Sequence, residues 1–226
     1  MTPITLTLPD RDEVLRYMGM PPERADEPLR NLVDSCAREL LQAVQPRWHF
    51  RLFDLSFESG GVRLSSGLFL PGTALAQHVT GCKQAFVFCT TLGSQVDLLI
   101  RQVQCMDMTR ALALDCCASA LIEQLCDHAE LQLQQQFPSC FFPYRFSPGY
   151  GDLPLEVNTA LLDVLDAPIQ IGLCATASHL LTPRKSVTAL LGVADHPIDS
   201  NKRSCLGCSA HDSCSFRKSG GHCGFS

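Results

Sequence analysis

The sequence is poor in charge, and its apolar residues never form a run long enough to cross a membrane. Charged residues make up 18% of the 226-residue chain, against roughly 25% in an average globular protein. Two uncharged windows, 67–82 and 167–183, are interrupted by proline, glutamine or histidine and fall short of the about 20 apolar residues that a transmembrane helix needs. These absences exclude a disordered polyelectrolyte and predict a packed globular protein without a membrane span.

The sequence does not indicate a secretion signal or stabilising disulfide bonds either. Residues 1–14 lack the basic and apolar regions of a secretory signal, so we expect a cytoplasmic protein. Thirteen cysteines are the anomaly of the composition. They make up about 6% of the chain, below the roughly 8–10% that is typical of disulfide scaffolds, and we therefore expect reduced thiols.

Common catalytic signatures are also missing. The sequence contains no G-x-x-x-x-G-K, G-x-G-x-x-G, H-E-x-x-H or G-x-S-x-G motif, which excludes the usual phosphate-binding, dinucleotide-binding, metalloprotease and hydrolase signatures. The net charge is −5, with an acidic excess over residues 1–182 and a basic excess over 183–226. Nonspecific binding to nucleic acid depends on lysine and arginine, so the acidic body argues against it.

Hydrophobic periodicity predicts an α+β fold in which a bent antiparallel or mixed sheet is flanked by helices. The apolar alternation that begins at Trp48 changes phase between Leu52 and Phe53, which predicts a bulge or bend in that strand. We expect one main domain, residues 1–200, and a short tail, residues 201–226. The predicted helices cover 10–19, 28–46, 71–81, 94–106, 109–136 and 155–165, and the predicted strands cover 48–57, 62–64, 85–91, 169–174 and 186–193.

A line of polar side chains interrupts the most apolar part of the long helix. Asp115, Ser119 and Glu123 recur at intervals of four residues within the apolar stretch 111–126, so they share one helix face. Buried carboxylates need compensation. The line therefore faces either an arginine elsewhere in the core, which is the commoner case, or a ligand, a partner or water.

Residues 143–154, PYRFSPGYGDLP, form an unusual loop with three prolines, two glycines, Arg145 and Tyr150. Prolines fix the backbone and glycines let it bend, so such a loop presents amides and carbonyls at fixed positions. An arginine fork pairs with a carboxylate, and a tyrosine adds a ring with a hydroxyl group. The composition fits a site for a polar, carboxylate-bearing small molecule about as well as it fits a rigid surface turn with Tyr150 on the core.

The string RFSPGYGDLP, the helix after it and KSVTALLGV at 185–193 resemble the activation domain of cobalamin-dependent methionine synthase. The segments TTLGSQVD at 90–97 and LALDCCASALIEQL at 112–125 are similar to the same family, especially to its free-standing members. The resemblance covers roughly residues 80–195. It implies an activation-domain-like fold that binds S-adenosylmethionine and serves the reductive methylation of cobalamin on a partner.

The resemblance also implies site residues and partners. It places S-adenosylmethionine against Arg145, the backbone of Ser147 and Gly149, and the acids Asp115 and Glu123, with Tyr150 toward the cobalt in a catalytic role. The implied partners are the cobalamin-binding domain of methionine synthase, or another corrinoid protein, and an electron donor such as a flavodoxin or ferredoxin. No nucleic acid or membrane is expected as a partner.

The tail carries four cysteines in a segment too polar to build a core of its own. A bound metal would supply the missing folding energy, so a metal site is predicted. One close pair and two single cysteines favour an iron–sulfur cluster first and zinc second, with free or paired thiols as the third reading. The predicted ligands are Cys205, Cys208, Cys214 and Cys223.

Three functions remain open at this point. The first is a free-standing activation component of methionine synthase. The second is a redox protein that reactivates a different corrinoid methyltransferase. The third is an adaptor without catalytic function, stabilised by zinc in its tail.

Overall fold

The computed structural model describes residues 4–198 of the chain. Its main sheet is antiparallel throughout, with the strand order β3-β2-β1-β4-β7. A second, two-stranded sheet pairs β5 with β6. The strands are β1 (Arg47–Glu58), β2 (Gly61–Leu64), β3 (Phe69–Pro71), β4 (Gln84–Thr91), β5 (Cys174–Ala175), β6 (Leu181–Thr182) and β7 (Ser186–Val193).

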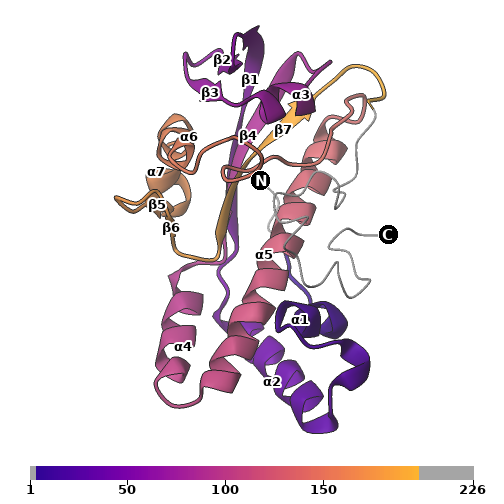
Figure 1. The fold of residues 1–226 in the computed structure, drawn as a ribbon, viewed down its shortest axis with the longest axis vertical. Coiled ribbons are helices and arrows are strands. Elements are labelled where there is room, and N and C mark those ends of the chain that lie inside the picture. Colours follow the sequence, from indigo (N-terminus) through magenta and orange to yellow (C-terminus); the bar gives the residue numbers. More distant parts are fainter. Residues whose placement is uncertain (1–3, 199–226) are drawn as a thin grey trace.

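Helices cover the sheet on both faces and extend beyond it at one end (Figure 1). The long helix α5 runs along one face and continues into a bundle with α1, α2 and α4, while α6 and α7 lie on the other face. The predicted α+β fold with a helix-flanked antiparallel sheet is therefore confirmed. The helices are α1 (Arg11–Tyr17), α2 (Glu27–Ala43), α3 (Thr73–His78), α4 (Ser94–Gln104), α5 (Met108–Gln136), α6 (Val157–Leu165) and α7 (Ala167–Ile171), with a short 3-10 turn at Pro22–Arg24.

Aspartate side chains fix where three of the helices begin. Asp10 accepts hydrogen bonds from the amides of Asp12 and Glu13, Asp26 accepts one from Leu29, and Asp107 accepts one from Arg110. Each carboxylate satisfies amide groups that have no partner within the helix and opposes the positive end of the helix dipole. The boundaries of α1 and α2 thus follow from residues that the sequence makes visible.

Strand β1 explains the change of phase in its apolar residues. It pairs with β4 as far as Asp54 and with β2 from Leu55 onward, in continuous register, so the strand contains no bulge. Trp48 and Phe50 pack on the side of α5, whereas Phe53 and Leu55 pack on the side of α3 and α6. The phase changes because the covered face of the strand changes.

The predicted strand over 169–174 is wrong. Residues 167–171 form the short helix α7, and only Cys174–Ala175 are extended, as β5. Pro168 occupies the first turn, and Gly172 ends the helix with φ +69°. Proline is compatible with a first helical turn, and glycine readily adopts the left-handed conformation at a helix end.

Two further structural facts bear on the predictions. The nine cysteines between residues 4 and 198 are free thiols, and six of them are buried. No helix in this part of the chain is both long and apolar enough to span a membrane. The four cysteines of the predicted metal site, Cys205, Cys208, Cys214 and Cys223, lie outside the described residues, as does most of the predicted tail domain.

Candidate functional site

A cleft of about 270 Å³ opens where the loop 143–154 meets α5 and β7. The loop contributes Arg145, Ser147, Pro148 and Tyr150 to its wall, and α5 contributes Glu123. The rest of the lining comes from Leu155 and Asn158, from the segment around β6, and from the start of β7 and the residues before it, with Leu180, Leu181, Arg184, Ser186, Val187 and Thr188. The structure thus brings four of the predicted site residues together, three from the loop and Glu123 from α5.

Backbone pairing with β7 holds one end of the loop. The amide of Phe146 donates to the carbonyl of Leu190, and the amide of Leu190 donates to the carbonyl of Phe146, both at 2.8 Å. The loop therefore covers the outer edge of β7, which would otherwise be an unpaired edge strand. Its register on the sheet fixes the place of Arg145 and Ser147 beside the cleft.

Asp152 fastens the other end of the loop to α3. Its carboxylate accepts hydrogen bonds from the Thr73 amide at 2.7 Å, the Thr73 hydroxyl at 2.8 Å and the Ala74 amide at 3.0 Å. These bonds stabilise the ionised form and hold the pKa of Asp152 below its usual value. The loop is thus tied down at both ends.

Glycine is required at the bend between these two anchors. Gly151 adopts φ +53°, and a Cβ added to it would lie 2.6 Å from the Cβ of Ala74. Gly149 adopts φ +92°, and its amide donates to the carbonyl of Leu153 at 2.8 Å. That amide is engaged within the loop, and Gly149 is not among the residues that line the cleft.

Arg145 is bound to carboxylates of α5. Its guanidinium pairs with Glu123 at 2.5 Å, with Asp127 at 2.7 Å and with Glu130. The arginine side chain is only 5% exposed, whereas the three acids are 26%, 45% and 24% exposed. Within residues 4–198, three carboxylates of α5 thus share the Arg145 guanidinium beside the cleft.

The polar line on α5 is satisfied by basic side chains. Lys185 contacts Asp115 at 3.0 Å and the Ser119 hydroxyl at 2.9 Å, while Glu123 pairs with Arg145. Of the two expectations for this line, ion pairing within the protein is the one that the contacts show. Asp115 does not line the cleft because it lies two helical turns, about 12 Å, from Glu123.

Tyr150 lines the cleft and is partly open to solvent. Its side chain is 40% exposed, and its ring meets the edge of the Phe146 ring with centroids 5.9 Å apart. The ring thus rests on the core from one side and faces outward from the other. A catalytic role for Tyr150 stays a prediction, as do the ligand contacts of the other predicted site residues.

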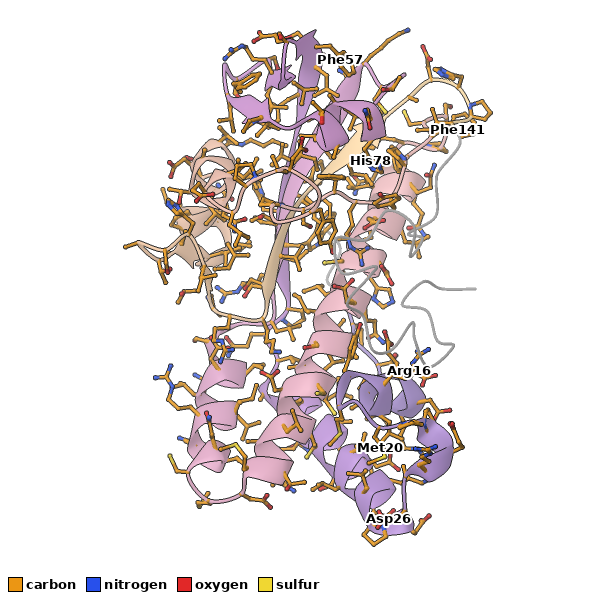
Figure 2. All side chains as sticks on the ribbon, in the orientation of Figure 1. Arg16, Met20, Asp26, Phe57, His78 and Phe141 are labelled. Carbon is orange, nitrogen blue, oxygen red and sulfur yellow. The ribbon has the colours of Figure 1, made fainter. Side chains whose placement is uncertain are left out.

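Several residues of the site gave no recognised signal in the sequence. His78, labelled in Figure 2 at the end of α3, does not line the cleft but supports its loop, since Nε2 donates to the Tyr144 carbonyl at 2.7 Å, and burial lowers the pKa of His78. Asn158 is buried between the Thr188 hydroxyl at 2.6 Å and the His179 carbonyl at 3.0 Å. Asp127 did carry a readable signal, because it continues the acidic stripe of α5 four residues after Glu123.

Comparison with known proteins supports the fold that these elements build. No protein-family model and no curated protein sequence matches the chain. The structure does have the fold of a methionine synthase activation domain. One similar solved structure is the MetH reactivation domain bound to AdoHcy, with a TM-score of 0.63 at 13% sequence identity, over 95% of this chain and 82% of that one. The resemblance read from the sequence is therefore confirmed at the level of the fold.

Metal binding is not decided by the described part of the chain. Within residues 4–198, no group of three or more histidine, cysteine, aspartate or glutamate side chains is arranged to hold a metal ion. The predicted ligands of the tail fall outside these residues. The iron–sulfur cluster and its zinc alternative stay predictions.

Proposed function

We propose that the cleft binds S-adenosylmethionine and that the protein is a free-standing activation component for a cobalamin-dependent methionine synthase. The observation that carries this proposal is the position of the cleft. In a chain with the fold of a domain that binds AdoHcy, it lies under the loop 145–150 that carries the resemblance. The charge of the site supports the same ligand class, since S-adenosylmethionine has a sulfonium and an ammonium group.

For methyl transfer from S-adenosylmethionine to cobalt, the main task of the protein is to hold the ligand in the right position. The sulfonium methyl group is already activated, and its transfer to a reduced cobalt needs no general base. The residues of the cleft therefore have to bind, orient and exclude water. Ser147 offers a hydroxyl group in the lining of the cleft, and the Glu123 carboxylate favours a cationic ligand.

Titration calorimetry tests the proposal. We expect one-to-one binding of AdoHcy and S-adenosylmethionine to the purified protein. ATP serves as the control, because it shares the adenosine portion and carries a negative triphosphate that the carboxylates of α5 repel. If neither AdoHcy nor S-adenosylmethionine binds, or if ATP binds as tightly, the proposed function is wrong.

We further propose that Tyr150 contacts the corrinoid partner. Its partly exposed ring in the lining of the cleft supports a role toward a docked macromolecule, since a partner that covers the cleft would meet this ring. Replacing Tyr150 with phenylalanine keeps the ring on Phe146 and removes the hydroxyl group. We expect AdoHcy affinity within twofold of the native value and slower reactivation of oxidised cobalamin on the partner. Equal reactivation rates would contradict this role.

The tail is proposed to supply the electron that reductive methylation consumes. Cys205, Cys208, Cys214 and Cys223 would hold an iron–sulfur cluster, and such a cluster would supply one-electron redox chemistry between a flavodoxin or ferredoxin and the corrinoid partner. Analysis of iron, acid-labile sulfide and zinc after anaerobic purification distinguishes the alternatives. Iron with sulfide supports the relay, whereas zinc alone makes the tail structural and leaves electron delivery to another protein.

A further inference from the structure

Strand β1 has an open edge along its first half. Residues 47–54 pair with β4 on one side, and β2 joins the other side only from Leu55 onward. Within residues 4–198, no strand pairs with the second edge of this first half. Such an edge presents a row of free N–H and C=O groups, on which another strand can pair.

The alternation along β1 decides which backbone groups point to this edge. The Asp54 carbonyl accepts a hydrogen bond from the Ser65 amide at 3.0 Å, so the backbone groups of Asp54 point away from β4. Neighbouring residues of an antiparallel strand point their groups in opposite directions. The N–H and C=O groups of Trp48, Phe50 and Leu52 therefore face the same way as those of Asp54, and the described part of the chain provides no hydrogen-bond partner for them.

The outer strands of the sheet are protected, in contrast to this segment. The loop 143–154 covers β7 through the pairing of Phe146 with Leu190, and β3 has only three residues and ends in Pro71. Covering loops, short strands, proline, lysine and bulges are the usual ways in which proteins block an edge. Residues 47–53 contain no proline or lysine, and their register with β4 is continuous, so no bulge blocks the edge either.

The helices cover the faces of the sheet beside this edge. Helix α5 lies over β4 and β7 on one face, and α6 and α7 lie on the other face (Figure 1). On the α5 side of β1, Phe50 is partly exposed and Leu52 is 39% exposed. Apolar side chains and free backbone groups thus occur together along the edge, and a strand that paired there would satisfy both.

The segment is complementary to a second copy of itself. In an antiparallel pair with a twofold axis at Phe50, Phe50 lies opposite Phe50, and Trp48 lies opposite Leu52 of the second copy. Every outward-facing N–H and C=O group of these residues then has a partner. A register shifted by two residues brings in either Pro46, which has no N–H, or Asp54, whose carbonyl is already bonded.

The charged residues of the segment permit the same register. On the face of α6 and α7, His49 lies opposite Arg51 of the second copy. Burial lowers the pKa of His49, so its imidazole is neutral near pH 7. Arg51 pairs with Asp166 of its own chain at 2.5 Å. The pairing of His49 with Arg51 therefore places no two like charges opposite each other.

We infer that the open edge of β1 pairs with β1 of a second copy of this chain, which makes a dimer with one continuous antiparallel sheet. The cleft lies beside β7, which is separated from β1 by β4. The paired edge thus points away from the cleft. The inference is independent of the ligand that is proposed to bind there.

Sedimentation velocity over a range of protein concentrations tests the inference, with a reducing agent present because the chain has 13 cysteines. We expect a dimer whose share rises with concentration. Leu52→Lys should raise the dissociation constant of the dimer by about 10-fold or more, because the symmetric interface loses two apolar cross-strand pairs and gains two charges. Leu131→Lys is the matched control, since Leu131 is 54% exposed on α5, and it should dimerise as the native protein does.

Amide hydrogen exchange measured by NMR on the native protein shows which edge is paired, and it does not depend on how any variant folds. Protection at Trp48, Phe50 and Leu52 should rise with protein concentration. Protection at His49 and Arg51 should stay constant, because these residues already pair with β4. A monomer at every concentration, a Leu52→Lys dimer as tight as the native one, or constant protection at Trp48, Phe50 and Leu52 would each overturn the inference.

Discussion

Replacing Arg145 with alanine is expected to lower the free energy of unfolding by about 3 kcal/mol, the low end of the range for breaking a buried ion pair. The guanidinium is almost fully buried, and its removal takes away the cation that Glu123, Asp127 and Glu130 share. The low end applies because the three carboxylates are a quarter to nearly half exposed, so water compensates part of their charge. Urea denaturation followed by circular dichroism measures the change.

Arg11→Ala provides the control for this measurement. Arg11 pairs with a single carboxylate, that of Asp34, at 3.2 Å, and both side chains are substantially exposed. Such a surface pair contributes about 0.2–1 kcal/mol. Added salt should reduce the difference in the free energy of unfolding between the native protein and the Arg145→Ala variant, because salt screens the repulsion among the carboxylates. If Arg145→Ala lowers the free energy of unfolding no more than Arg11→Ala does, the ion pairs of Arg145 do not stabilise the packing of the loop on α5.

The Arg145 cluster also shows what a sequence can and cannot reveal about a site. The loop 143–154 stands out by composition, and its place beside a cleft agrees with that signal. In the sequence, Arg145 reads as a residue that binds the carboxylate of a ligand. Its partners in the structure are carboxylates of α5 that are 15 to 22 residues away in the chain, so the sequence around Arg145 does not point to them. Only the packing of the loop on α5 decides which carboxylates it meets.

Local structure was more predictable than long-range pairing. Asp10 and Asp26 mark the starts of two helices by their own chemistry, and β7 is visible as an apolar run. The prediction of a strand at α7 was wrong because Ile169 and Ile171 alternate as apolar residues do in a strand. In the structure these residues are helical, and Ile169 is 84% exposed. The partner of Asp115 is Lys185, seventy residues further along the chain, and no local pattern indicates it.

Filling the cleft is expected to abolish ligand binding with little effect on the fold. Ser147 lines the cleft, and its backbone carbonyl accepts a hydrogen bond from the Tyr150 amide at 3.1 Å. A tryptophan at this position leaves that backbone bond in place and puts an indole ring into a space of about 270 Å³. We expect Ser147→Trp to weaken AdoHcy binding at least about 100-fold, which corresponds to roughly 2.7 kcal/mol.

Calorimetry measures this loss, and thermal unfolding of the same variant shows whether the fold is intact. Ser59→Trp is the matched control, because Ser59 is exposed in the turn between β1 and β2 and does not line the cleft. It should bind AdoHcy as the native protein does. If the Ser147→Trp variant has the same unfolding temperature as the native protein and still binds AdoHcy with native affinity, the ligand does not occupy this cleft. AdoHcy would then bind elsewhere on the chain.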